Sequence, residues 1–234
     1  MNELVKISNV TKKYGKKVAL ENVSIDVKAG EIIGLLGPNG SGKTTLIKVL
    51  NCLLADYEGS IMVEGNQLGI DSKKIISYLP DVDYFESWMK GNDALELFMD
   101  MYKDFDYERC MSLLTKFLID PKMKFKNMSK GMKEKFMLSL VMSRKAKILI
   151  LDEPIGGVDP AAREVILDTI LENYSSEQTI ILSTHLIADI ERIFNRVIFI
   201  KEGRIVLDDE VDAVREKTGK SIDELFREEF KYVA

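Results

Sequence analysis

The sequence predicts an α/β fold with a mixed, mainly parallel sheet at its core, an antiparallel β layer at the N-terminus and a helical subdomain. Residues 4–10 and 23–27 alternate between apolar and polar side chains, as half-buried antiparallel strands do, and Tyr14 and Gly15 form a turn between them. Three continuous apolar runs, typical of parallel strands buried on both faces, are residues 32–36, 148–151 and 180–182. A helix-like segment follows each run, as parallel strands joined by helices require.

The region from residue 92 to residue 143 carries apolar side chains at helical spacing. Ala94, Phe98, Met101 and Phe105 follow one another at intervals of three or four residues, which favours helices over strands. The methionines of this region indicate core packing rather than a cofactor site. We therefore expect a single domain over residues 1–234, with its core at 1–80 and 146–234 and its helical subdomain at 81–145.

Composition and charge exclude several other classes of protein. A chain of 234 residues with 46% hydrophobic side chains can bury a large core. Its net charge of -5 argues against nucleic-acid binding through a broad basic surface. The two cysteines, Cys52 and Cys110, lack the spacing of a metal site, which favours free thiols in a reducing cytoplasm.

The sequence also lacks the usual signals for secretion or membrane insertion. Its N-terminus reads Met-Asn-Glu-Leu-Val-Lys, without the basic and apolar segments of a signal peptide. The longest apolar runs are far shorter than the roughly 20 residues that a membrane-spanning helix needs. We therefore expect a cytoplasmic protein with no direct membrane insertion.

The segment directly after the first apolar run matches a phosphate-binding loop. Residues 37–44 read Gly-Pro-Asn-Gly-Ser-Gly-Lys-Thr, the pattern G-x-x-x-x-G-K-[ST], and a helix is expected to follow up to Asn51. The glycines let backbone NH groups and the helix N-terminus face phosphates, Lys43 adds a full positive charge, and Thr44 can ligate Mg²⁺. The residues that we expect to bind nucleotide here are Gly37, Pro38, Asn39, Gly40, Ser41, Gly42, Lys43, Thr44 and Thr45.

Two carboxylates follow the second apolar run. Asp152 and Glu153 come at the end of this strand, which is where open α/β sheets place their ligands. We expect Asp152 to hold Mg²⁺ and Glu153 to polarise the water that attacks the γ-phosphate. The alternative is a strand that simply leaves the core into solvent.

The chain has a single histidine, His185, directly after the third apolar run and its two polar residues. The carboxyl ends of parallel strands meet at one edge of a sheet, so His185 should lie near the phosphate loop and Glu153. From there it can donate a hydrogen bond to a γ-phosphate. The alternative is a histidine with a structural role only.

The phosphate loop, the pair Asp152 and Glu153, and His185 occur in the order found in the ATPase domain of ABC transporters, which the chain resembles over nearly its whole length. The resemblance implies a P-loop NTPase of the ABC ATPase type, with ATP and Mg²⁺ as cofactors and Lys43, Glu153 and His185 in catalysis. The signature segment of this family, commonly LSGGQ, corresponds to residues 128–132, which read Met-Ser-Lys-Gly-Met.

In this segment the resemblance implies that Ser129 and Gly131 contact the γ-phosphate, although an ordinary helix cap is the alternative. Lys130 and Met132 replace the usual glycine and glutamine, a change that is similar to some bacterial export-type subunits. In the family the signature acts on nucleotide held by a second subunit. The resemblance therefore implies a head-to-tail homodimer or heterodimer with two shared sites.

Three further positions are assigned by the resemblance. Tyr14 matches the aromatic residue that stacks on adenine, with strand-edge packing as the alternative. Asp159 matches a segment through which the subunits communicate, and it is also suited to start a helix before Pro160. Asp81 stands where the family usually has glutamine, so we expect a shorter, charged side chain that reaches Mg²⁺ through water.

The function that the resemblance implies is an ATP-binding and ATP-hydrolysing subunit that powers a separate membrane permease from the inner face of the cell membrane. We expect the permease to dock on residues 82–89, which include Tyr84, Phe85 and Trp88, unless these aromatics only cap the helical core. One alternative function is a soluble ABC-type ATPase in assembly or regulation without a permease. Another is a nucleotide-binding regulator with weak hydrolysis, against which Glu153 argues.

Overall fold

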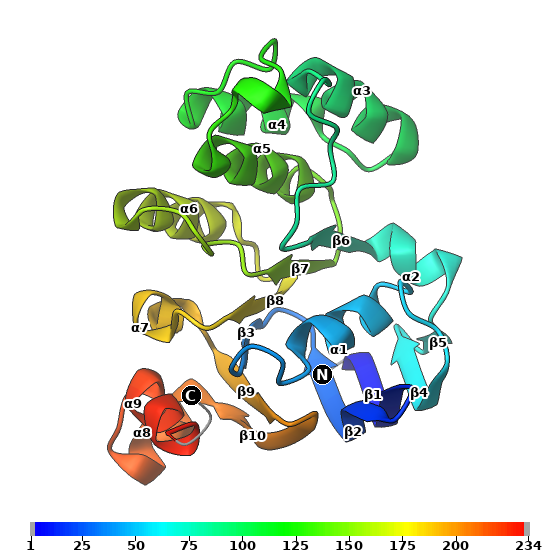
Figure 1. Ribbon diagram of the computed structural model, residues 1–234, viewed down its shortest axis with the longest axis vertical. Helices are drawn as coiled ribbons and strands as arrows, with labels where there is room; N and C mark the ends of the chain where they lie inside the picture. The colour runs from blue at the N-terminus through cyan, green and yellow to red at the C-terminus, as the bar shows by residue number, and fades with distance from the viewer. Residues whose placement is uncertain (1–2, 232–234) are drawn as a thin grey trace.

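Two sheets form the framework of the computed structural model, which describes residues 3–231 (Figure 1). The smaller sheet has the order β2-β1-β4-β5 and is antiparallel throughout. Its strands are β1 (Glu3–Tyr14), β2 (Lys17–Lys28), β4 (Tyr57–Val63) and β5 (Asn66–Gln67). The N-terminal β layer is therefore confirmed, and it has two more strands than the alternating segments predicted.

The main sheet has the order β10-β9-β3-β8-β7-β6, with every neighbouring pair parallel except β10 and β9. Its strands are β3 (Ile32–Leu36), β6 (Ile76–Leu79), β7 (Ile148–Asp152), β8 (Thr179–Thr184), β9 (Arg196–Lys201) and β10 (Arg204–Glu210). Every residue of β3, β7 and β8 is buried. These are the three strands that the continuous apolar runs predicted.

The helices and short 3₁₀ segments lie on both faces and at one end of the main sheet (Figure 1). They are α1 (Lys43–Leu50), α2 (Ile70–Ile75), α3 (Gly91–Met101), α4 (Tyr107–Lys116), η1 (Phe125–Asn127), α5 (Lys130–Met142), α6 (Pro160–Asn173), α7 (Ile187–Ile190), η2 (Glu191–Ile193), α8 (Val211–Thr218) and α9 (Ile222–Glu229). The helices α3, α4 and α5 gather beyond β6, within residues 81–145. The domain boundaries given above stay a prediction.

The apolar spacing predicted that Phe105 lies on the same helix as Phe98, and this prediction is wrong. Phe105 lies between α3 and α4, where it forms an isolated antiparallel bridge with Arg144. The neighbouring Asp104 pairs with the buried guanidinium of Arg144 at 3.1 Å, which draws this segment out of helical geometry. Phe105 still packs edge-on against Phe98, with ring centroids 5.6 Å apart, so its apolar character serves the core as expected.

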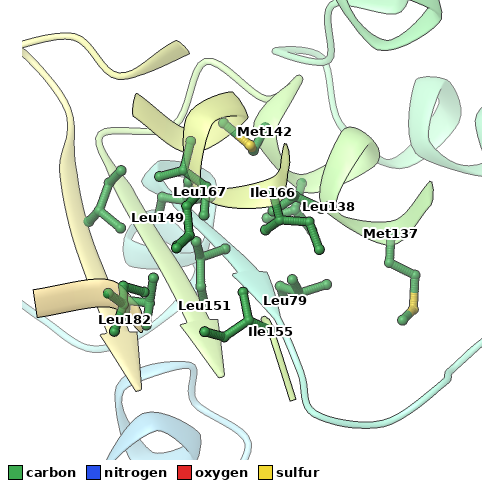
Figure 2. Close-up of a cluster of buried hydrophobic side chains, with 14 of the residues drawn as sticks. Leu79, Met137, Leu138, Met142, Leu149, Leu151, Ile155, Ile166, Leu167 and Leu182 are labelled. Atoms are coloured by element: carbon green, nitrogen blue, oxygen red, sulfur yellow. The ribbon is translucent and has the colours of Figure 1, made fainter. Parts of the chain in front are cut away.

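Successive residues of the buried strands face two different core clusters, one on each side of the main sheet. Leu149 and Leu151 of β7 belong to the cluster formed with α5 and α6, which Figure 2 shows. Ile148 and Ile150 belong to the cluster formed with α1 and the antiparallel sheet. Because side chains alternate along a strand, Asp152 points to the α1 side, as Ile150 does.

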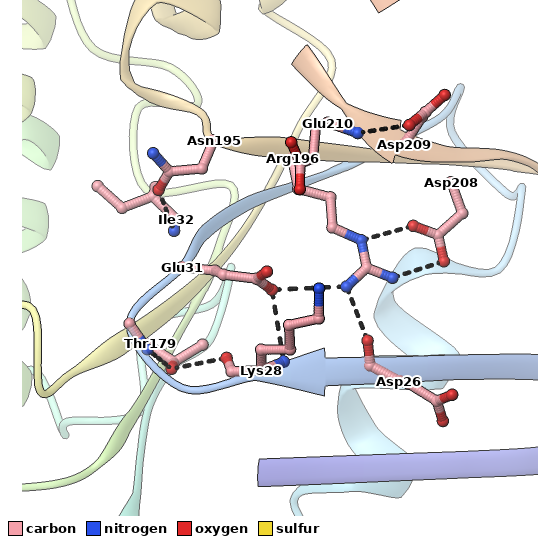
Figure 3. Close-up of polar contacts among 11 residues, drawn as sticks. Asp26, Lys28, Glu31, Ile32, Thr179, Asn195, Arg196, Asp208, Asp209 and Glu210 are labelled. Carbon is pink, nitrogen blue, oxygen red and sulfur yellow. Dashed lines mark hydrogen bonds and ion pairs between the residues drawn. The ribbon is translucent and has the colours of Figure 1, made fainter. Parts of the chain in front are cut away.

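Arg196, at the start of β9, ties the two sheets together (Figure 3). Its Nε and Nη2 donate to the carboxylate of Asp208 on β10 at 2.6 and 2.8 Å, and its Nη1 donates to the backbone carbonyl of Asp26 on β2 at 2.7 Å. Only 13% of the Arg196 side chain is exposed. Shielding from water makes this forked contact stronger than a surface ion pair.

No helix within residues 3–231 combines the length and the apolar composition that crossing a bilayer demands.

We predict that Arg196→Ala lowers the free energy of unfolding by about 2 kcal/mol, because Asp208 and the Asp26 carbonyl lose their shared donor. Chemical denaturation measures this change. Arg204→Ala is the matched control, since Arg204 makes a similar contact with Glu21 but both side chains are largely exposed. Equal losses in the two variants would contradict a special role for Arg196.

Candidate active site

The loop between β3 and α1 has a backbone that only glycine accommodates at several positions. Gly40 and Gly42 have φ angles of +80° and +119°, in the left-handed region. A Cβ atom on Gly37 would lie 2.4 Å from the backbone oxygen of Ile200, and one on Gly42 would lie 2.8 Å from that of Ala19. The glycines therefore let the loop turn tightly against β9 and β2, with α1 starting directly behind it.

Lys43 is buried beneath this loop, with 5% of its surface exposed. Its Nζ donates hydrogen bonds to the carbonyl oxygens of Gly37 at 2.7 Å and Pro38 at 3.3 Å, and lies 3.8 Å from Oε1 of Glu153. Burial lowers the pKa of Lys43, while the nearby carboxylates of Glu153 and Asp152 oppose this change. A phosphate would replace the carbonyl contacts with stronger, charge-assisted hydrogen bonds.

Asp152, at the end of β7, is almost fully buried, and burial raises its pKa. Its Oδ1 accepts a hydrogen bond from the hydroxyl of Ser183, and the nearby hydroxyl groups of Ser183 and Thr44 oppose the rise in the pKa of Asp152. Its Oδ2 is buried without a hydrogen-bond partner in the described part of the chain. An unpartnered buried carboxylate oxygen beside a threonine hydroxyl suits Mg²⁺, which prefers oxygen ligands.

Mg²⁺ is usually held by one or two protein carboxylates together with substrate phosphates rather than by a full protein cage. Residues 3–231 contain no cluster of three histidine, cysteine or carboxylate side chains placed to bind a metal. Asp81 lines the same pocket as Lys43 and Thr44. The structure therefore places Thr44, Asp152 and Asp81 around one region, and the residues present fit the ion.

Glu153 and His185 lie in contact at the carboxyl ends of β7 and β8. Glu153 has a φ of +53°, and its NH donates to the backbone oxygen of Ser183 at 3.0 Å. Its Oε2 lies 2.9 Å from Nδ1 of His185. A positive φ is costly for a residue with a side chain, so the strand end holds Glu153 in a strained conformation next to Lys43 and His185.

A surface pocket of about 210 Å³ opens beside the loop. The residues that line this pocket and were predicted from the sequence to form the site are Tyr14, Asn39, Gly40, Gly42, Lys43, Thr44, Thr45, Asp81 and Glu153. Gly37, Pro38 and Ser41 do not line this pocket; Ser41 is buried behind it and accepts a backbone hydrogen bond from Gly203 at 2.7 Å. The predicted loop residues thus divide into a lining layer and a supporting layer.

Tyr14 stands at the rim of the pocket with 47% of its surface exposed, and the Lys12 ammonium lies 5.6 Å from its ring centroid. The exposed ring is free to stack on a base, and this role stays a prediction. The pocket also contains Lys17 and Ala19 of β2, which the sequence analysis missed. The signal available for Lys17 was a basic residue directly after the turn that carries Tyr14.

Ser129 and Gly131 are not brought to this pocket. Ser129 caps α5, where its hydroxyl accepts a hydrogen bond from the NH of Met132 at 3.2 Å. A second cavity, of about 270 Å³, lies between α5 and the strand ends, and it is lined by Lys130, Glu134, Asp81 and Glu153 among others. Burial raises the pKa of Glu134, which the sequence analysis also missed, to about 7.

Comparison with known proteins identifies this arrangement. A family model described as "ABC transporter" matches residues 20–156, more than half of the chain. The chain belongs to this ABC transporter family. The expected fold class, a P-loop NTPase of the ABC ATPase type, is thereby confirmed, and so is the predicted function as an ATP-hydrolysing subunit of an ABC transporter.

Individual relatives agree along nearly the whole ABC domain. The uncharacterized ABC transporter ATP-binding protein YdbJ of Bacillus subtilis is 35% identical over 95% of this chain and 74% of its own. The lantibiotic transport ATP-binding protein SrtF of Streptococcus pyogenes is 31% identical over 98% of both chains. A solved structure of an ATP binding subunit of an ABC transporter superimposes with a TM-score of 0.87 and 28% identity, covering 96% of this chain and 98% of that one.

We predict that Lys43→Ala weakens ATP binding by at least about tenfold, because a buried positive charge next to the phosphates is lost. Isothermal titration calorimetry measures the affinity. Lys48→Ala is the control, since Lys48 lies on the same helix but is exposed. Unchanged ATP affinity in a folded Lys43→Ala chain would show that this loop is not the phosphate site.

Proposed function

We propose that this chain binds ATP and Mg²⁺ in the pocket at the phosphate loop, hydrolyses ATP together with a second ATPase subunit, and thereby drives a membrane permease. The observation that carries the proposal is the convergence of Lys43, Asp152, Glu153 and His185, from three separate segments, at one edge of the main sheet. A nucleotide-binding regulator with weak hydrolysis would not need these four groups together. An ABC-type ATPase without a permease would need them too, and the names of the relatives, among them a lantibiotic transport ATP-binding protein, favour the transport role over it.

The pocket supplies the contacts that a nucleotide needs. Tyr14 offers its exposed ring to adenine, and the backbone NH groups at the start of α1 face the phosphates. Lys43 leaves its loop carbonyls to contact the β- and γ-phosphates. Thr44 and Asp152 would hold Mg²⁺, with Asp81 reaching it through water, and the bound ion would neutralise charge on the phosphate oxygens.

Glu153 and His185 act on the γ-phosphate and the water that attacks it. Glu153 lies next to Lys43, with 10% of its side chain exposed, so it is shielded from bulk water but close to the bound phosphates. It accepts the proton of the attacking water. His185, which contacts Glu153 at 2.9 Å, turns to the γ-phosphate and donates a hydrogen bond to the charge that develops there.

A second subunit completes the site. Ser129 and Gly131 lie at the N-terminus of α5, outside the pocket of their own chain. A helix N-terminus attracts anions, and Gly131 adds no side chain that would keep a phosphate away. In a head-to-tail pair, this end of α5 faces the γ-phosphate held by the partner, whether the partner is a second copy or a related ATPase.

The permease docks in an apolar groove rather than on the whole of residues 82–89. Phe85 of that segment is not a free anchor, since it packs in the helical core and stacks on Phe125 with ring centroids 4.8 Å apart. Trp88 is 66% exposed and Tyr84 is 41% exposed, so these two aromatics remain available to a partner. The docking site predicted from the sequence is corrected at Phe85 for this reason.

The groove has a volume of about 510 Å³ and runs between α3, β6 and the end of α1. Its exposed apolar members are Leu53, Tyr84, Leu97 and Met101. Exposed apolar surface of this kind marks protein interfaces. Pro80 lines the groove and Asp81 lines the nucleotide pocket, so docking can influence hydrolysis through adjacent residues. A subunit held in this way sits on the inner face of the membrane.

We predict that Glu153→Gln binds ATP with near-normal affinity but loses more than about 99% of its turnover, because the water loses its base while the phosphate contacts remain. Phosphate release measures turnover, and calorimetry measures binding. ATP-bound dimers should accumulate and be visible by size-exclusion chromatography. Near-normal hydrolysis by this variant would contradict the role of Glu153 as the base, and Asp81 would then be the alternative carboxylate for that role.

We predict that the double variant Leu97→Glu, Met101→Glu no longer binds the permease. The measurement is copurification: the tagged subunit is mixed with detergent-solubilised membrane protein from its source cell, and the membrane protein recovered with it is compared with the wild type. The two residues lie one turn apart on α3, and charges there would have to be desolvated on docking. Met99→Glu is the control, because Met99 on α3 is about as exposed as Leu97 but does not line the groove. Undiminished recovery of the double variant would place docking elsewhere.

A further inference from the structure

We infer that Arg163 is a positioning residue that sets the distance between the segment carrying His185 and the segment carrying Glu153. This role rests on the proposed function and adds to it a side chain outside the nucleotide pocket. Arg163 belongs to the first turn of α6, and it acts through the two catalytic segments rather than on ATP itself.

The guanidinium of Arg163 donates in two directions. Its Nε donates to the backbone oxygen of Val158 at 3.1 Å, and its Nη1 donates to Oδ2 of Asp189 on α7 at 2.8 Å. Only 23% of the Arg163 side chain is exposed. A planar guanidinium holds two such partners at a fixed separation, which a lysine ammonium on a flexible stem does not.

Each of the two partners is closely tied to one catalytic segment. Val158 follows Glu153 by five residues and is 5% exposed, and its segment is shaped by a backbone hydrogen bond from Gly156 to Glu153 at 2.9 Å. Asp189 follows His185 by four residues. The residues Ile187 and Ile190 on either side of Asp189 are buried, so this segment is anchored in the core.

His185 depends on its backbone for its position. Its side chain is 46% exposed, and in residues 3–231 its ring makes one polar contact, with the carboxylate of Glu153. That contact has to be exchanged for the γ-phosphate during the proposed reaction. From then on, the place of the ring is set by the backbone between β8 and α7, which Arg163 fastens through Asp189.

The alternative is that Arg163 and Asp189 form an ordinary surface ion pair, which joins α6 to α7 and has no effect on catalysis. The chain contains such a pair close by: Arg192 of η2 contacts Asp168 of α6 at 3.4 Å, and both side chains are more than half exposed. Pairs of this kind contribute little to stability. Arg192 therefore provides a matched control: it has the same charge and contacts the same helix, but within residues 3–231 it makes no hydrogen bond to the segment after Glu153.

The test uses the full chain at a concentration at which it forms dimers, with phosphate release measured over a range of ATP concentrations. Arg163→Ala should lower kcat about tenfold, the scale expected for a small misplacement of a catalytic group, with KM for ATP and Tm nearly unchanged. Asp189→Ala should give the same loss, and Arg163→Lys should resemble Arg163→Ala. Arg192→Ala should match the wild type.

Double variants separate positioning from a general structural effect. If Arg163 acts through His185, adding Arg163→Ala to His185→Ala should cause little further loss of kcat. A wild-type kcat in Arg163→Ala, an equal loss in Arg192→Ala, or a full tenfold loss on top of His185→Ala would each overturn the role of Arg163. So would loss of ATP-dependent dimers when Arg163→Ala is combined with Glu153→Gln, since Arg163 would then act on the subunit contact.

The same measurements distinguish this role from the proposed function. Turnover by the wild-type chain together with unaffected Arg163→Ala overturns only the role of Arg163. A wild-type dimer that binds ATP but shows no turnover overturns both.

Discussion

The register of three parallel strands decides where the functional side chains of this protein lie. Leu35 of β3 pairs with Ser183 of β8, and Ser183 pairs with Asp152 of β7. The segments after these residues therefore leave the sheet side by side, which brings the phosphate loop, Glu153 and His185 together. A one-residue slip of β7 would turn Asp152 away from Thr44 and into the core against α5 and α6.

Much of this site could be predicted because its residues belong to short sequence patterns that can be recognised without knowing the fold. The glycines and Lys43 of the phosphate loop follow a fixed spacing, and fully buried strands produce apolar runs that end in Asp152, Glu153 or His185. The meeting of these residues followed from one rule about parallel sheets. This rule predicted that His185 lies near Glu153, but not that the two side chains contact each other at 2.9 Å.

Other features depend on contacts between distant segments, which a linear pattern does not carry. Phe85 and Trp88 look alike in the sequence, yet only Phe85 meets Phe125 and becomes part of the core. Glu134 has a raised pKa because α5 packs over the strand ends. The strands β4, β5, β6 and β10 were missed because their side chains neither alternate strictly nor form an apolar run as long as that of β7. The strand β9 was missed although residues 197–200 form an apolar run as long as residues 148–151. Arg163 was missed because its two partners come from separate segments.

The contact between Glu153 and His185 has a consequence for when the subunit can hydrolyse ATP. The oxygen of Glu153 that lies 2.9 Å from the imidazole is already engaged in a hydrogen bond, so it is a poor proton acceptor in this conformation. Under the proposed mechanism, a bound γ-phosphate has to part the two side chains before water can react. Under that mechanism, a subunit without a bound γ-phosphate keeps Glu153 and His185 in contact with each other, so the two side chains take up their catalytic positions only once ATP has bound.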